Sequence, residues 1–232
     1  YFREKTGSRP NVDKQNPDIK INLHIVDRQC TVSLDSSGNT LDKRGYRTVT
    51  VDAPMNEVLA AGLLLDSGIS NYSVFHDPMC GSGTLAIEAA MISQNKAPGL
   101  LRNFSFVNWR NFDEDIYMDL RSEVQSNEKH QKMEIIASDI NMKTIEACKL
   151  NADRAGVDDK IEIKNMDFFQ SFTDKNKGMI ITNPPYGERL NEGDDIIEFY
   201  KNIGNHLKNN YQGWDAYIFS GNLQDLKNFG LK

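Results

Sequence analysis

The chain has 232 residues, of which 39% are hydrophobic and 26% are charged, and this composition predicts a globular protein with one sizeable core and a small appendage. No apolar stretch is long enough to cross a membrane and no signal peptide opens the chain, so we expect a cytoplasmic protein with no membrane partner. Cys30, Cys80 and Cys148 are far apart and the four histidines lack metal-ligand spacing, which argues against a disulfide framework and against a metal site.

The net charge of −6 and the isoelectric point of about 5.3 argue against a strongly basic nucleic-acid binder. The charge is unevenly distributed, because residues 1–51 carry nine Lys and Arg against six Asp and Glu. Any electrostatic footprint for a nucleic acid is therefore expected at the N-terminal end. The excess is small for a segment of this length, so charge alone leaves the question open.

The first predicted elements are two short strands. Residues 19–26 alternate strictly between apolar and polar side chains, and residues 30–35 form a second strand that ends in a Ser-Ser-Gly-Asn turn. These strands are typical of the end of a small α/β module. An apolar helix is expected over residues 54–65, closed near Gly68.

Residues 73–91 form a buried strand, a glycine-rich turn and a helix in succession. This arrangement is half of a nucleotide-cofactor site, because Gly81 and Gly83 allow positive φ and close approach of the backbone to a ligand. The turn has neither the G-x-G-x-x-G dinucleotide pattern nor the Gly-Lys-Ser/Thr of a P-loop. Asp77 at the end of the strand favours a cationic ligand over a pyrophosphate, and S-adenosylmethionine is such a ligand.

A polar and aromatic insertion over residues 96–130 separates this unit from a renewed alternation of strands and helices. The later elements are expected as strands over 133–138, 160–164, 178–182 and 214–220, helices over 142–155 and 195–207, and a short helix from Asn222. This alternation predicts an α/β fold with a parallel, doubly wound, Rossmann-like sheet. Such sheets bind ligands at the carboxyl ends of their strands.

Two acidic residues follow the ends of successive predicted strands. Asp139 can accept hydrogen bonds from both ribose hydroxyls of a nucleoside, and Asp167 can accept one from an adenine amino group, with Phe168 beside the ring. A single Asp after a strand is usually a helix N-cap or a turn residue. Two of them, together with the glycine turn, favour a cofactor site.

The segment Asn183-Pro184-Pro185-Tyr186, entered from an apolar strand, suits the methylation of a planar amine. The lone pair of such a nitrogen is delocalised, so the nitrogen is a poor nucleophile. The side-chain carbonyl of Asn183 and the backbone carbonyl of Pro184 can accept its two N–H bonds and hold it in line with a methyl donor. The prolines stiffen the loop, and Tyr186 offers a stacking face for an extruded base. A simple turn after a buried strand is the alternative.

Two segments of the chain resemble the THUMP-associated class I methyltransferases: Asp-Pro-Met-Cys-Gly-Ser-Gly-Thr at 77–84 and Asn-Pro-Pro-Tyr-Gly-Glu-Arg-Leu at 183–190. The closest likeness is to the bacterial RlmL-type large-subunit rRNA guanine-N2 methyltransferases, and it extends over segments 43–47, 53–57 and 104–109. The resemblance implies that S-adenosylmethionine is bound by Asp77, Pro78, Cys80, Gly81, Gly83, Thr84, Asp139, Asp167, Phe168 and Asn183. Cys80 is then a small side chain beside the cofactor and not a nucleophile of the cytosine-C5 type.

The resemblance also implies that the chain consists of two parts. Residues 1–50 correspond to the C-terminal part of a THUMP-like RNA-binding module with its linker, and Lys43, Arg44 and Arg47 are expected to contact RNA. Residues 51–232 correspond to the methyltransferase domain. The family pattern continues into a β-hairpin after the last predicted strand, so a truncated C-terminus is expected for this domain.

The implied activity is direct, in-line methylation of the 2-amino group of guanine in RNA, with large-subunit rRNA as the expected substrate. Asn-Pro-Pro-Tyr also serves adenine-N6 DNA methyltransferases and enzymes that methylate glutamine amides. Adenine methylation in DNA is therefore the alternative. A third possibility is an RNA-binding protein that keeps the cofactor fold without catalysis.

Overall fold

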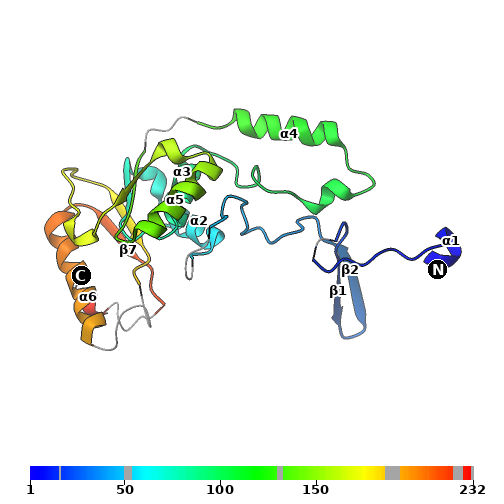
Figure 1. Cartoon of the computed structure of the whole chain (residues 1–232), viewed down its shortest axis with the longest axis horizontal. Helices are drawn as coiled ribbons and strands as arrows, with labels where there is room; N and C mark the ends of the chain where they lie inside the picture. The colour runs from blue at the N-terminus through cyan, green and yellow to red at the C-terminus, as the bar shows by residue number, and fades with distance from the viewer. Residues whose placement is uncertain (16, 50–53, 130–132, 186–193, 222–226, 231–232) are drawn as a thin grey trace.

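The computed structural model describes residues 1–15, 17–49, 54–129, 133–185, 194–221 and 227–230. Figure 1 shows an α/β body joined to an extended N-terminal region that holds α1 (Phe2–Thr6) and a β-hairpin. Residues 186–193, which include Tyr186, lie outside the described residues. So does the start of the short helix predicted from Asn222, and the structure has a single turn of 3-10 helix over Lys227–Phe229 just beyond it.

The body is built on a five-stranded sheet in which every strand runs parallel to its neighbours, in the order β5-β4-β3-β6-β7. The strands are β3 (Val74–Asp77), β4 (Glu134–Asp139), β5 (Ile161–Asn165), β6 (Met179–Thr182) and β7 (Asp215–Ile218). The chain moves outward from β3 to β5 and then returns to the other side of β3. The strand order reverses between β3 and β6, which is where such sheets open a ligand crevice. The predicted doubly wound α/β fold is thus confirmed.

Helices cover both faces of the sheet. Helices α2 (Glu57–Asp66), α3 (Thr84–Ser93) and α5 (Met142–Ala155) share one buried apolar cluster, and α6 (Asp194–Asn210) contributes to another. Strand β6 contacts both clusters, because Met179 and Ile181 belong to the first and Ile180 to the second. Successive side chains of a strand point to opposite faces, so this alternation places the two helix layers on opposite sides of the sheet.

Helix α5 begins and ends where the sequence predicts. The side chain of Asn141 accepts a hydrogen bond from the backbone N–H of Lys143 at its start, and Gly156 closes it with φ at 62°. Shorter 3-10 turns lie at Ile69–Asn71, Asp158–Lys160 and Phe168–Gln170. The last of these, η4, follows β5 and contributes to the site described below.

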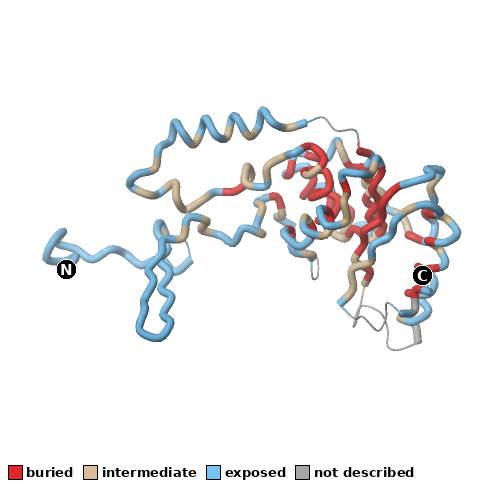
Figure 2. Tube along the Cα trace, turned by 180° about the vertical axis from the view of Figure 1, so that it is seen from behind, coloured by how far each residue is buried: buried red, intermediate tan, exposed pale blue. Residues whose placement is uncertain are grey.

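The N-terminal hairpin pairs β1 (Ile21–Val26) with β2 (Gln29–Leu34) in antiparallel register. Ile21 faces Leu34 and Leu23 faces Val32, so these apolar side chains gather on one face of the hairpin. All four of these side chains are exposed. Figure 2 shows that the rest of the hairpin is exposed as well. The two predicted strands are confirmed with small shifts at their ends.

The insertion over residues 96–130 contains a helix that was not predicted from the sequence. Helix α4 (Glu114–Ser126) begins at Asp113, whose side chain accepts a hydrogen bond from the backbone N–H of Ile116, and none of its residues is buried. A 3-10 turn at Ser105–Asn108 precedes it. The aromatic side chains that hold the segment together are Phe104, Phe106, Phe112 and Tyr117, with ring centroids 5.2 to 6.0 Å apart.

Arg102 fastens the insertion to the segment that follows the hairpin. Its guanidinium group donates hydrogen bonds to the backbone carbonyls of Ser37, Asn39 and Thr40 at 2.6 to 2.9 Å. The backbone N–H of Phe106 also donates to the carbonyl of Ser36. In Figure 1 the insertion extends from the body toward the hairpin, in agreement with these contacts.

Within the described ranges, no helix combines the length and apolar character that crossing a bilayer requires. The same residues contain no group of three or more His, Cys, Asp and Glu side chains placed to hold a metal ion.

Candidate cofactor and active site

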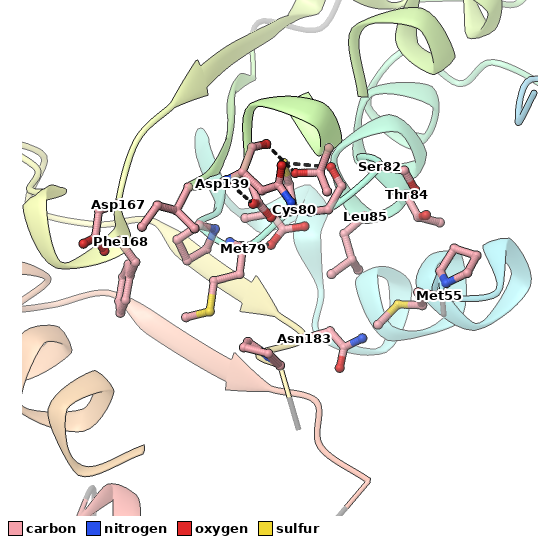
Figure 3. Close-up of a pocket in the computed structure, with 18 of the residues that line it drawn as sticks. Met55, Met79, Cys80, Ser82, Thr84, Leu85, Asp139, Asp167, Phe168 and Asn183 are labelled. Carbon is pink, nitrogen blue, oxygen red and sulfur yellow. Dashed lines mark hydrogen bonds between the residues drawn. The ribbon is translucent and has the colours of Figure 1, made fainter. Parts of the chain in front are cut away.

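A cavity of about 790 Å³ opens at the carboxyl end of the sheet (Figure 3). The predicted residues that line it are Asp77, Pro78, Cys80, Gly81, Thr84, Asp139, Asp167, Phe168, Asn183 and Pro185. They come from the segments that end or follow four neighbouring strands, so the fold brings together residues more than a hundred positions apart. Gly83 and Pro184 are described but do not line the cavity.

Asp77 is the last residue of β3 and is 2% exposed. Its Oδ1 accepts a long hydrogen bond of 3.4 Å from the backbone N–H of Met79. Burial raises the pKa of Asp77 to about 7, because the ionised carboxylate loses its hydration. A cation in the cavity would stabilise the ionised form, so this carboxyl group suits a positively charged ligand.

The two glycines of the turn have different roles. Gly81 has φ at 53°, a Cβ built on it would meet no atom within 4 Å, and it lines the cavity. Gly83 has φ at 87°, and a Cβ there would lie 2.4 Å from Sγ of Cys148 on α5. In the structure this glycine allows α3 to pack closely against α5, and the expectation that Gly83 leaves room for the ligand stays a prediction.

Asp139 ends β4 and already holds two backbone groups. Its Oδ2 accepts a hydrogen bond from the N–H of Gly81 at 2.9 Å, and its Oδ1 accepts one from the N–H of Asn141 at 2.8 Å. A carboxylate has about four acceptor positions, so capacity remains for hydroxyl groups in the cavity. The glycine turn and the end of β4 are thereby fixed to each other.

Asp167 starts the short η4 turn. Its Oδ1 accepts a hydrogen bond from the backbone N–H of Phe169 at 3.0 Å, as in a helix N-cap. Phe168 is 4% exposed, whereas Phe169 is 39% exposed, and both line the cavity. The N-cap interpretation and the ligand interpretation of Asp167 are therefore compatible, because one bond leaves the carboxylate with free lone pairs.

Asn183 follows β6 directly and lines the cavity. Its Oδ1 is buried and has no hydrogen-bond partner among the described residues. An unpaired buried acceptor costs about 1–3 kcal/mol, so this oxygen is available to accept a hydrogen bond from a ligand in the cavity. Pro185, two positions further along the chain, also lines the cavity.

Cys80 is buried near a second thiol. Its contact with Cys148 and its burial raise the pKa of Cys80 well above its ordinary value. A thiol in this environment stays protonated and is a poor nucleophile. The structure agrees with Cys80 as a small side chain of the cavity wall.

Several lining residues were missed by the sequence reasoning: Met55, Met79, Leu85, Lys143, Phe169 and Phe199. Met55 lies in one of the segments that carry the family resemblance, so a signal for it existed. Lys143 and Phe199 lie within helices whose periodicity predicts only the helix. Nothing local distinguishes them from other exposed or packing residues.

Arg47 is enclosed by the protein. Its Nε donates to Oε1 of Glu57 at 2.9 Å, and its Nη2 donates to the carbonyl of Met55 at 2.7 Å and to Oγ1 of Thr84 at 3.0 Å. The Arg47 side chain is 11% exposed and that of Glu57 is 9% exposed. These bonds involve Nε and Nη2, whereas Nη1 is buried with no partner among the described residues, and they brace two residues of the cavity. They weigh against the expected contact of Arg47 with RNA, which stays a prediction.

Arg44 is similarly occupied. Its Nε lies 3.4 Å from Oε1 of Glu88, which also accepts a hydrogen bond from the hydroxyl of Tyr46 at 3.1 Å. The Arg44 side chain is only 12% exposed, which weighs against an RNA contact here too, and that contact stays a prediction. Lys43 is exposed and is the one of the three predicted residues that is free to meet a phosphate.

Residues 44–230 match the family described as RMKL-like, methyltransferase domain, and residues 1–35 match the THUMP domain. The chain belongs to the RMKL-like methyltransferase family. The match contains the whole five-stranded sheet and every described residue of the cavity wall. The family that the motifs at 77–84 and 183–190 indicated is thereby confirmed.

Related proteins place this RMKL-like domain within longer chains. The ribosomal RNA large subunit methyltransferase K/L of Syntrophotalea carbinolica is 38% identical over 100% of this chain, which spans 34% of that protein. A crystal structure of a methyltransferase complexed with SAH is 34% identical, with a TM-score of 0.83 over 92% of this chain and 56% of its own. A predicted N6-adenine-specific DNA methylase from Listeria monocytogenes has the same identity, TM-score and coverage. These likenesses establish the fold but do not identify the substrate.

Proposed function

We propose that this chain is the cofactor-binding and catalytic part of an S-adenosylmethionine-dependent methyltransferase that modifies the 2-amino group of guanine in RNA. We propose large-subunit rRNA as the substrate and the cytoplasm as its location. The observation that carries the proposal is the composition of one cavity. Asp77, Asp139 and Asp167 line it together with Asn183, whose buried Oδ1 has no partner within the described part of the chain.

The described residues fit the proposed cofactor. Asp77 suits its ammonium group, because burial raises the pKa of this carboxyl and a cation would offset the cost of ionising it. Asp139 has free acceptor positions for the ribose hydroxyls, and Asp167 has them for the adenine amino group. Phe168 supplies an apolar surface for the ring. A cofactor-sized ligand fits a cavity of about 790 Å³.

The wall around the methionine end is made by the turn after β3. Gly81 leaves open space beside its backbone. Pro78, Cys80 and Thr84 line the same part of the cavity. Gly83 contributes indirectly in this proposal, because it sets how closely α3 and its first residue, Thr84, approach α5.

The chemistry proposed for the protein groups concerns the substrate amine. The cofactor supplies a methyl group on a positively charged sulfur. Asn183 Oδ1 and the carbonyl of Pro184 accept the two N–H bonds of the amine, which raises electron density on the nitrogen and orients it. Pro184 and Pro185 restrict φ and hold these acceptors in place. After methylation the nitrogen is acidic and releases its proton to water, so no protein nucleophile is required.

The proposed target base leaves its stack before it reaches Asn183. Extrusion costs a few kcal/mol, and stacking on an aromatic side chain returns about 1–3 kcal/mol. Tyr186 is the side chain proposed for this contact. Its position follows Pro185 directly in the sequence.

RNA is favoured over DNA by two findings. Residues 1–35 match the THUMP domain, and the relative from Syntrophotalea carbinolica is named for ribosomal RNA. Lys43 is the described basic residue that we propose for a phosphate contact near the linker. The name of the Listeria monocytogenes protein favours adenine-N6 methylation of DNA as the second candidate. The unpaired acceptor on Asn183 weighs against a protein without catalysis.

Labelled-methyl transfer distinguishes these candidates. The chain is incubated with methyl-labelled cofactor and either unmodified large-subunit rRNA or duplex DNA, and the nucleosides are then separated by mass spectrometry. Label in N2-methylguanosine supports the proposal. Label in N6-methyladenine would move the assignment to the second candidate. Binding of S-adenosylhomocysteine without transfer to either polymer would overturn catalysis by this chain.

A further inference from the structure

A hydrogen-bonded network of buried polar groups lies on the α6 face of the sheet and connects three strand ends. The hydroxyl of Tyr211 lies 3.2 Å from Nδ1 of His76 and 2.7 Å from Oγ of Ser171. Beyond them, Nε2 of His76 lies 3.1 Å from Oγ of Ser138, and Oγ of Ser171 lies 2.6 Å from the carbonyl of Phe168. Each of these five residues is at most 4% exposed. A fully bonded buried network of this kind has a definite geometry.

Three residues of this network are direct sequence neighbours of the three carboxylates that line the cavity. The neighbouring pairs are His76–Asp77, Ser138–Asp139 and Asp167–Phe168. The backbone carbonyl of Ser138 also accepts the N–H of Cys80 in the glycine turn at 2.9 Å. The network therefore touches each strand end that supplies a proposed cofactor contact, from the face opposite to α2, α3 and α5.

Only one assignment of donors and acceptors satisfies all the hydrogen bonds of this network. The Phe168 carbonyl only accepts, so Ser171 donates to it and must accept from Tyr211, which in turn accepts from Nδ1–H of His76. Burial lowers the pKa of His76 to about 3, so the ring is neutral and Nε2 accepts from Ser138. Each donor hydrogen of the network then forms one hydrogen bond. Removing one hydroxyl breaks the connection between β3 and η4.

Two kinds of contact tie η4 to the sheet. The backbone N–H of Met166 and Nδ2 of Asn165 donate to the carbonyl of Asp139, which joins the start of the turn to β4, and the network joins its end to β3. The η4 turn follows β5, which is an edge strand and is separated from β3 by β4.

The Tyr211 hydroxyl crosses that separation by joining His76 of β3 to Ser171 at the end of η4. The Tyr211 ring also stacks on Phe168 with centroids 6.2 Å apart. A second link comes from His206, whose Nε2 lies 2.8 Å from the carbonyl of Ser171.

We propose that Tyr211 is a positioning residue that sets how well the site recognises the adenine ring of the cofactor. It does so by holding the η4 turn, with Asp167 and Phe168, at a fixed position relative to Asp77 and Asp139. The inference rests on the proposed function, since it assigns η4 to the adenine end. Tyr211 lies outside the cavity wall and acts only through its neighbours.

The test compares S-adenosylhomocysteine with S-inosylhomocysteine by calorimetry. The second ligand has an oxygen in place of the adenine amino group, so it presents an acceptor to Asp167 and should bind the unmodified chain about tenfold or more weakly. Tyr211→Phe keeps the ring and removes the hydroxyl. We expect it to weaken S-adenosylhomocysteine binding by about fivefold or more and to reduce the preference over S-inosylhomocysteine by at least about threefold.

The control is Tyr72→Phe, which removes the hydrogen bond between another tyrosine hydroxyl and Asp215 at the opposite end of the sheet. It should leave the preference unchanged. Ser171→Ala should act like Tyr211→Phe, and the double variant should add little, because both break one chain. Ser171→Ala also serves as the test if Tyr211→Phe does not fold.

The outcomes separate the two claims. Failure of the unmodified chain to bind S-adenosylhomocysteine would overturn the proposed function together with this inference. Normal binding by the unmodified chain, with the same adenine preference in Tyr211→Phe and Ser171→Ala, would overturn the positioning role alone. An equal loss of preference in Tyr72→Phe would show a general effect of destabilisation and would also overturn it.

Discussion

Gly81 donates its backbone N–H to Oδ2 of Asp139 at 2.9 Å, so the carboxylate that ends β4 holds the glycine turn that follows β3. The other oxygen of Asp139 accepts the N–H of Asn141, which starts α5. One side chain thus joins two strand ends and a helix start at the cavity. Its role in the fold and its proposed role toward ribose are performed by the same two atoms.

Asp139→Ala should therefore affect stability as well as binding. Two backbone N–H groups lose their acceptor, and the free energy of unfolding should fall by about 1–3 kcal/mol. Asp139→Asn should be intermediate, because an amide has a single acceptor oxygen. Urea unfolding of the three proteins measures the effect. An unchanged midpoint in Asp139→Ala would show that other contacts hold the turn.

The pKa of Asp77 gives the ligand-free protein a defined pH dependence. The pKa rises from an ordinary 3.8 to about 7 through burial, so the folded state binds a proton more tightly than the unfolded state. The stability from this group is fully present below about pH 4 and is lost as the pH rises to about 7. The total is on the order of 4 kcal/mol. Thermal unfolding across this range should show that loss, and Asp77→Asn should remove it.

Cofactor affinity should have the opposite dependence. An ammonium group binds the ionised form of Asp77, so S-adenosylhomocysteine should bind more tightly as the pH rises from about 6 to 8, by up to about tenfold per unit below the pKa of Asp77. Calorimetry in buffers of different ionisation enthalpy should also detect proton release on binding. A pH-independent affinity would place the ammonium group elsewhere.

Gly81→Ala and Gly83→Ala form a matched pair. Both positions have positive φ, which costs about 1 kcal/mol for a non-glycine residue. At Gly83 the new Cβ would also lie 2.4 Å from Sγ of Cys148, so this variant should lose several kcal/mol of stability, and Cys148→Gly should restore part of it. At Gly81 the Cβ meets no protein atom, so the fold should persist while affinity for S-adenosylhomocysteine falls. Equal stability of both variants would contradict this.

The glycine pair shows what the sequence can specify. A strand, a Gly-x-Gly turn and an apolar helix follow from local pattern, and so do the ends of α5 at Asn141 and Gly156. The different roles of Gly81 and Gly83 do not, because they depend on Cys148, which reaches the turn from another helix. Local signals fix elements, whereas close packing between distant elements decides what each glycine does.

Two other features of the structure were not predicted from the sequence. Helix α4 has no buried residue, yet Asp113 offers an N-cap and Ile116, Leu120 and Val124 stand at helical spacing, so the sequence carried a signal for this helix that the expectation of an irregular insertion missed. Arg44 and Arg47 stand in a basic run that looks exposed in the sequence, yet their partners Glu88 and Glu57 lie on α3 and α2. A charge count cannot distinguish an arginine paired inside the protein from one free to bind phosphate.

Arg47→Met and Lys43→Ala should separate these roles. Arg47→Met leaves the buried carboxylate of Glu57 without its ion pair and should cost about 3–5 kcal/mol of stability. Lys43→Ala should leave stability within about 0.5 kcal/mol and reduce the salt slope of RNA binding by about one unit if Lys43 touches a phosphate. Filter binding at several salt concentrations measures the slope. A normal slope in Lys43→Ala would remove the linker from the proposed RNA contact.

Asn183→Ala tests the catalytic proposal most directly. Its buried Oδ1 has no partner in the ranges that the structure describes, so the substitution removes no hydrogen bond of that atom there, and the fold should survive. Affinity for S-adenosylhomocysteine should remain nearly intact, because the proposed contacts of Asp77, Asp139 and Asp167 are untouched. The methylation rate should fall by about 10²–10³, the usual loss for one preorganised polar contact in a transition state. Single-turnover methyl transfer with saturating cofactor measures that rate separately from binding. A parallel loss of cofactor affinity and stability would instead make Asn183 a structural turn residue after β6.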